Sequence, residues 1–267
     1  FSDIGFSAMG KAGALDYTLE IASRDDGDAV EGSGRETGSA NLRLGWQLTD
    51  AHRLSASYRY LDGERTSYPE QGGGPEFALS DELDESDYED QIVALSWDAQ
   101  VTEQWRSTLS ASRFDHEEQY FSPGIVPYDA VPPNAADTDF QRDQLQWVNT
   151  IGLAEGYQLN LGADYRDEEG DSEGYLEFYG FQFPTDFEMD RASRGVFASL
   201  SAQPIDDFLL QGSARYDDPD DFDSETSINV GGSYFFAGGF SVAANWGEAF
   251  KLPSFFALGH PLVGNLD

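Results

Sequence analysis

Apolar and polar residues alternate with a period of two along most of this chain. Between residues 40 and 48, Leu42, Leu44 and Trp46 fall on one side of an extended backbone, while Asn41 and Arg43 fall on the other. This alternation is typical of a β-strand with one apolar face and does not fit the 3.6-residue period of a helix. The pattern recurs over residues 54–60, 93–97, 105–111, 145–151, 157–165, 208–216, 228–236 and 240–246. Helix start signals followed by a long 3.6-residue period are nearly absent, so we predict an all-β fold.

The connections between these segments alternate between short and long. Short connections fall at residues 48–52, 101–104, 154–156, 204–207 and 237–239. Long connections rich in Asp, Glu, Gly and Pro fall near residues 25–35, 67–87, 120–138 and 171–190. Tight turns on one rim and long loops on the other are typical of an antiparallel transmembrane β-barrel. We count about twelve strands if residues 4–9 pair with the segment that starts at Gly13.

The second face of these strands is too polar for a protein core. It carries charged and amide side chains, which a dry interior would not tolerate without dedicated partners. They are Arg43, Gln47, Arg59, Asn149, Asn160, Asp164, Arg166, Gln211, Arg215, Asn229 and Asn245. A water-filled or plugged lumen would accommodate them, and aromatic residues near the strand ends suit a membrane interface. The alternative from this pattern is a soluble β-sandwich or propeller.

Composition and charge narrow the possible functions. The 267 residues contain 50 Asp and Glu against 15 Lys and Arg, which gives a net charge of −35 and argues against nucleic acid as a partner. The chain has no Cys, which excludes a disulfide scaffold, a thiolate zinc site and a cysteine nucleophile. The three His residues lie far apart in the sequence, and none has neighbours that would orient it for catalysis. We therefore expect no enzyme activity.

The segment from residue 239 to the end carries the most specific motif. Its distinguishing residues are Gly247, Phe250, Lys251, Pro253, Ser254, Gly264 and Asn265. This segment resembles the mid-barrel strand of TonB-dependent outer-membrane transporters, and residues 146–149 and 159–165 resemble hairpins of the same family. Within that family, the hairpin spacing looks most like that of cobalamin transporters. Leu266 departs from the pattern, because the family places a Pro after Gly-Asn.

The resemblance implies a role as well as a fold. The family barrel has about 22 strands around a plug domain, so we expect residues 1–267 to be a single barrel domain covering its first half, without the plug and incomplete at both ends. It implies the outer membrane of a Gram-negative bacterium, with contacts to membrane lipid and lipopolysaccharide. It also implies uptake of cobalamin or a ferric siderophore, energised by the inner-membrane TonB complex through the absent plug.

Aromatic residues in the long connections are candidates for binding the small-molecule ligand. They could offer flat contact area near the external mouth, or could only pack the loops together. The candidates are Tyr68, Phe77, Tyr120, Tyr128 and Tyr179. Few Lys or Arg residues occur in these loops, which favours a neutral or metal-bridged ligand.

Calcium is a candidate cofactor, because hard cations prefer carboxylate oxygens. One loop brings several carboxylates close together in sequence, and the next long loop adds more. The candidate ligands are Asp25, Asp26, Asp28, Glu31, Asp84 and Asp87. This spacing lacks the full EF-hand pattern, and the family resemblance also implies calcium-ordered loops. A solvated acidic surface is the alternative.

Two other functions remain open at this point. One is a self-contained barrel of about twelve strands that acts as a passive pore or an outer-membrane hydrolase. The other is a soluble, secreted β protein that binds calcium or glycans.

Overall fold

The computed structural model describes residues 1–27, 30–69, 75–76, 82–125, 131–261 and 264. Almost all of this part of the chain is extended. Its strands are β1 (Ser2–Ala12), β2 (Leu15–Asp25), β3 (Gly34–Thr49), β4 (His52–Ser67), β5 (Asp84–Thr102), β6 (Trp105–Ser122), β7 (Asn134–Ala154), β8 (Tyr157–Phe178), β9 (Phe181–Pro184), β10 (Phe187–Ile205), β11 (Phe208–Pro219), β12 (Glu225–Phe235) and β13 (Ser241–Gly247). One short helix, α1 (Phe255–Gly259), follows the last strand.

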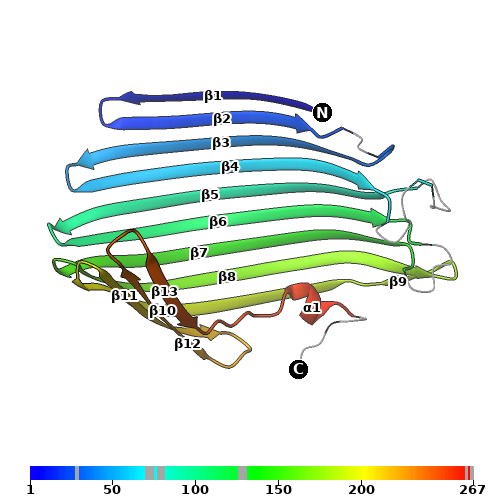
Figure 1. Cartoon of the computed structure of the whole chain (residues 1–267). Helices are drawn as coiled ribbons and strands as arrows, with labels where there is room; N and C mark the ends of the chain where they lie inside the picture. The colour runs from blue at the N-terminus through cyan, green and yellow to red at the C-terminus, as the bar shows by residue number, and fades with distance from the viewer. Residues whose placement is uncertain (28–29, 70–74, 77–81, 126–130, 262–263, 265–267) are drawn as a thin grey trace.

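The strands form one antiparallel sheet in which neighbours in sequence are neighbours in space (Figure 1). The path runs from β1 to β13, with the short β9 attached to β8 beside it. The twelve strands of that path confirm the predicted number, and the predicted pairing of residues 4–9 is present as Ile4 opposite Ser23 and Met9 opposite Thr18. Among the described residues, no helix is long and apolar enough to cross a membrane.

Tight turns lie together at one end of the sheet (Figure 1). Gly13 and Gly156 occupy two of these turns with φ angles of 62° and 76°, a region that a residue without a Cβ enters at no steric cost. The prediction of a long loop at residues 171–190 was wrong: β8 continues to Phe178, and β10 begins at Phe187. The acidic sequence there resembles a loop, but its backbone pairs with β7, β9 and β10.

The strand register gathers the apolar side chains on one side, which we call the outer face. Leu54 lies opposite Trp97, Trp97 opposite Leu109, and Leu109 opposite Trp147. These side chains are not sealed by protein: Leu95 is 58% exposed and Trp147 is 51% exposed. The soluble sandwich is therefore wrong, because the described strands form a single sheet with no second sheet over its apolar side.

The opposite side, the inner face, is polar as predicted, with one correction. Asn149 lies two residues from Trp147 and two from Ile151 in β7, so its side chain points to the outer face as theirs do. Its assignment to the polar face was therefore wrong. Its side-chain oxygen accepts a hydrogen bond of 2.9 Å from the indole nitrogen of Trp105 on β6. Within the apolar band this amide is thus satisfied by a partner on the neighbouring strand.

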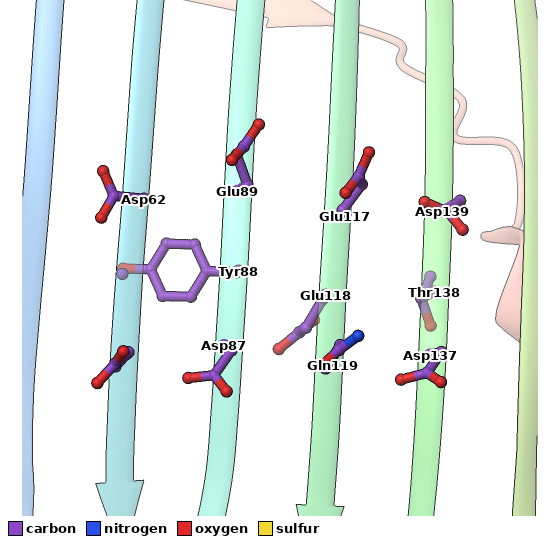
Figure 2. Close-up of a pocket in the computed structure, with 12 residues that line it drawn as sticks. Asp62, Asp87, Tyr88, Glu89, Glu117, Glu118, Gln119, Asp137, Thr138 and Asp139 are labelled. Atoms are coloured by element: carbon purple, nitrogen blue, oxygen red, sulfur yellow. The ribbon is translucent and has the colours of Figure 1, made fainter.

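Beyond the apolar band, away from the tight turns, the outer face becomes acidic. In one row across six strands, each carboxylate residue lies directly opposite the next. The row consists of Asp62, Glu89, Glu117, Asp139, Asp171 and Glu188. Figure 2 shows its first four members on β4 to β7, beside a second row that includes Asp87 and Asp137. Like charges directly opposite each other destabilise a sheet, so this arrangement costs stability.

Candidate functional site

A buried carboxylate shared by two arginines lies on the inner face of β7, β8 and β10. The register places Arg142 and Arg191 on either side of Glu168. Arg142 Nε donates to Glu168 Oε1 at 2.7 Å, and Arg191 Nη2 donates to Oε2 at 2.6 Å. Glu168 is only 3% exposed. Charge-assisted hydrogen bonds of this kind are the strong ones, and two cations on one anion leave a positive excess.

The chain after β13 leaves the sheet and crosses this group. We call residues 248–261 the strap, which contains α1 beside β10 (Figure 1). Arg191 Nη1 donates to the Pro253 carbonyl oxygen at 3.0 Å, and its guanidinium lies 5.0 Å from the ring centre of Phe255. Ser254 caps α1, since its Oγ accepts a 3.2 Å hydrogen bond from the Ala257 amide. Arg191 thus fastens the strap to the sheet.

An aromatic contact secures the strap at a second point. The Phe255 side chain is 9% exposed and meets the Phe140 ring edge-on, with ring centres 5.8 Å apart. A Cβ added to Gly170 would lie 2.7 Å from Cδ2 of Phe255, which is closer than real contacts allow. Glycine at position 170 therefore leaves the room that the ring occupies.

A second ionic group lies beside the first. Arg215 Nη1 donates to Asp164 Oδ2 at 2.7 Å, and its Nη2 donates to Asp217 Oδ1 at 2.6 Å. Together with the strap, the two ionic groups surround a cavity of about 710 Å³ on the inner face. Arg166 and Lys251 also line this cavity. The cavity therefore presents hydrogen-bond donors and charged groups to any molecule or protein segment on the concave inner face. Its described lining contains no nucleophile hydrogen-bonded to a general base.

Comparison with known proteins identifies the family. Residues 35–266 match a family model described as TonB dependent receptor-like, beta-barrel. The chain belongs to this TonB-dependent receptor family. Members lie in the outer membrane of Gram-negative bacteria and act as transporters rather than enzymes.

This receptor-family chain aligns with only part of the length of its individual relatives. The chain is 26% identical over 166 residues to the vitamin B12 transporter BtuB of Vibrio cholerae serotype O1. This alignment covers 62% of this chain and 24% of that protein. It is 32% identical over 111 residues to BtuB of Vibrio vulnificus, covering 42% of this chain and 18% of that protein. The chain thus spans about a quarter or less of the curated relatives.

Solved structures support the same fold at lower identity. The ferric citrate transporter FecA superimposes with a TM-score of 0.73 at 11% identity, covering 91% of this chain and 40% of that one. The ferripyoverdine receptor of Pseudomonas aeruginosa gives 0.73 at 13% identity, again covering 91% and 40%. The outer face of this receptor segment is therefore the lipid-facing side of a barrel wall, and the inner face lines the lumen.

The family motif that the sequence predicted forms the strap and its entry. Gly247 ends β13, Phe250 and Lys251 line the cavity, and Pro253 and Ser254 make the contacts given above. The Gly264 amide donates to the His260 carbonyl oxygen at 2.6 Å, and Asn265 lies outside the described residues.

The predicted ligand-binding aromatics do not converge on one place. Tyr120 lies on the inner face near the far end of β6, where burial raises the pKa of its phenol. Tyr179 is 93% exposed in the turn before β9, and Tyr68 is half-buried just after β4. Phe77 and Tyr128 lie outside the described residues. Ligand contact by these residues stays a prediction.

Two of the six predicted calcium ligands have partners among the described residues, whereas Asp84 Oδ1 is buried there without one. Asp25 Oδ1 accepts from the Gly27 amide at 2.7 Å, and Asp26 forms an ion pair with Arg24 at 2.6 Å. Asp84 and Asp87 point to opposite faces of β5, because their positions differ by three and side chains alternate along a strand. Glu31 is exposed, and Asp28 lies outside the described residues.

In the part of the chain that the structure describes, no group of three metal-binding side chains comes together. Calcium binding therefore stays a prediction.

The Arg142–Glu168–Arg191 group was not predicted from the sequence alone. The alternation of side chains along β7 is enough to place Arg142 on the polar face beside Gln144. The contact itself depends on the register between strands and on a strap that arrives from 62 residues further along the chain. A search for opposite charges at equivalent depth in successive hairpins would have suggested it.

Proposed function

We propose that this chain is part of the wall of an outer-membrane receptor that takes up a small ligand, either cobalamin or a ferric siderophore. In this proposal a plug domain elsewhere in the intact polypeptide fills the lumen. The inner-membrane TonB complex acts on that plug to admit the ligand. The lumenal arginines, carboxylates and amides of this chain bind the plug and line the route past it.

One observation carries the proposal: the sheet of a TonB-dependent receptor barrel has a charged, hydrogen-bonding inner face with a strap fastened across it. A passive pore needs only a polar wall, whereas this strap lies inside the lumen and narrows it. The self-contained pore would also need β1 to pair with β13, and no such pairing occurs among the described strands. Names of the relatives support both ligand classes, as vitamin B12 transporters and ferric siderophore receptors.

The test is uptake by the intact protein in a Gram-negative host that lacks its own cobalamin and siderophore receptors. We expect accumulation of radiolabelled cobalamin or of one 55Fe-labelled siderophore, and we expect it to cease when the host lacks TonB. Uptake of neither ligand would refute the proposal. Leakage of unrelated small solutes that does not depend on TonB would favour the passive pore.

The remaining partners belong to the same proposal. Membrane lipid would cover the apolar band, and lipopolysaccharide would surround the acidic rows on the outer face beyond it. Calcium binding can be measured directly by titrating the intact, chelator-treated protein with Ca²⁺. A heat of binding that persists in the Asp25→Asn and Asp26→Asn variants would exclude those two residues as ligands.

A further inference from the structure

The cavity beneath the strap concentrates the few cations of a very acidic chain. The chain has 15 Lys and Arg residues in total. Five of them line this one cavity: Arg142, Arg166, Arg191, Arg215 and Lys251. Four carboxylates share the lining, namely Asp164, Glu168, Asp217 and Glu248. The lining therefore carries a net charge of 5 − 4 = +1 in a protein whose net charge is −35.

Two of the five cationic side chains have no partner in the described part of the chain. Arg215 is held by Asp164 and Asp217, while Arg142 and Arg191 share Glu168. The side chains of Arg166 and Lys251 make no ion pair or hydrogen bond with another described residue. Glu248, the remaining carboxylate, likewise makes no ion pair within the described ranges.

Arg166 is the more informative of these two cations. Its Nε is buried and has no hydrogen-bond partner among the described residues. Buried N–H groups in proteins are almost always paired, so an orphaned one needs an explanation. Its position is set by the sheet, since it lies opposite Gln144 on β7 and Ser193 on β10, neither of which supplies an anion.

The chemistry of a guanidinium indicates what would satisfy it. Its planar fork of N–H donors matches the two oxygens of a carboxylate or phosphate, and an ammonium adds a point charge without directional demand. We propose that the cavity binds an oxyanion, a carboxylate or phosphate group of a small molecule in the lumen, between Arg166 and Lys251. The inference rests on the proposed function in taking that molecule to be cargo of the barrel.

Size and charge both suit a small-molecule group. A cavity of about 710 Å³ is large enough for more than a single ion and lies within the usual range of ligand sites. The two ionic groups at its border are internally paired, so they shape the walls without competing for the ligand. The cavity lining is positive, whereas the protein as a whole is strongly negative. The lining would therefore attract an anion only after the anion had entered the lumen.

The test uses the intact receptor in detergent at low ionic strength, titrated calorimetrically with inorganic phosphate and separately with citrate. We expect Arg166→Gln and Lys251→Gln each to weaken phosphate binding at least tenfold, and Arg166→Lys to weaken it less. The matched control is Arg194→Gln, which removes an exposed arginine from the outer face of β10 and should leave phosphate affinity within twofold. Thermal unfolding of each variant verifies that it is folded.

Three results would overturn the inference. The wild-type receptor could fail to bind either anion, as it would if a carboxylate of its own chain already filled the cavity. Arg166→Gln could bind phosphate as well as the wild type, or Arg194→Gln could weaken binding equally. Because this titration does not depend on transport, loss of phosphate binding in a receptor that still takes up its ligand refutes the site alone. Normal phosphate binding without uptake refutes the proposed function alone.

Discussion

Arg191 makes three different kinds of contact at once. Two of its nitrogens bind Glu168, the third binds a strap carbonyl, and its flat face covers Phe255. Lysine could not reproduce this set, because its ammonium is a single point charge without a planar face. The residue therefore connects the β8–β10 wall to the strap, and its loss should affect both.

We expect Arg191→Gln to lower the free energy of unfolding of the intact receptor by about 2 kcal/mol. Hydrogen bonds to charged groups contribute roughly 1.5–3 kcal/mol, and Glu168 keeps Arg142 as a partner. Chemical denaturation in detergent measures this change, with Arg106→Gln, at an exposed arginine near the tight-turn end of β6, as the control. A spin label on the strap should also become more mobile in Arg191→Gln. An immobile label and unchanged stability would show that the strap is held by other contacts.

Gly170 and Phe255 provide a second test at this scale. Because a Cβ at position 170 would overlap the ring, Gly170→Ala should destabilise the receptor by about 1–3 kcal/mol. In a Phe255→Ala background the same change should cost much less, since the obstructing ring is gone. The double-mutant cycle measures this coupling. Additive effects of the two substitutions would mean that they do not meet in the folded protein.

At the scale of elements, sequence alternation predicts strands well and their ends poorly. Each segment with the period-two pattern is a strand in the structure. Lipid contacts one face of such a strand, and this requires an apolar residue such as Leu, Trp or Tyr at every second position. Residues 171–190 were misassigned, because beyond the membrane that constraint ends and both faces become polar. The partners of Glu168 do not follow from the period-two pattern alone, since they depend on the cross-strand register between residues far apart in the sequence.

The acidic row gives a prediction that depends on pH. Burial raises the pKa of Asp171, and the facing carboxylates of Asp139 and Glu188 raise it further. Because the pKa of Asp171 is higher in the folded state than in the unfolded state, ionisation of its carboxyl disfavours the folded state. This destabilisation is absent below the unfolded-state pKa of about 3.9 and develops as the pH rises through the folded-state pKa. Asp171 lies beyond the apolar band, where protons reach it from water.

Asp171→Asn should therefore stabilise the receptor at pH 7 by roughly 0.2–1 kcal/mol, the usual size of a cross-strand charge effect. At pH 3 the gain should vanish, because the wild-type carboxyl is then protonated. Unfolding curves at both values provide the measurement, and Asp206→Asn, in the tight turn after β10, is the control. An equal gain at both pH values would show that charge repulsion is not the cause.

At the scale of the whole molecule, each strand separates two solvents. Its outer face is apolar over the band that starts at the tight turns, and its inner face carries arginine, carboxylate and amide groups. Only four apolar residues are buried among those described, so this segment has almost no core of its own. Its stability must come from lipid on one side and from lumenal contacts on the other, because strands within hydrocarbon need every backbone group paired.

A pair of arginine substitutions tests this sidedness. Leu95 lies on the outer face in the middle of the band, whereas Ser110 on the adjacent strand β6 faces the lumen opposite Ser96. Leu95→Arg places a charge in hydrocarbon and should cost roughly 2–4 kcal/mol, reducing the yield of folded receptor in lipid vesicles. Ser110→Arg places the same charge on the polar inner face, which already carries Arg166 and Arg215, so folding of the barrel should be nearly unchanged. The reverse result, with Leu95→Arg tolerated and Ser110→Arg unfolded, would mean that the outer face does not meet lipid and that the barrel orientation is inverted.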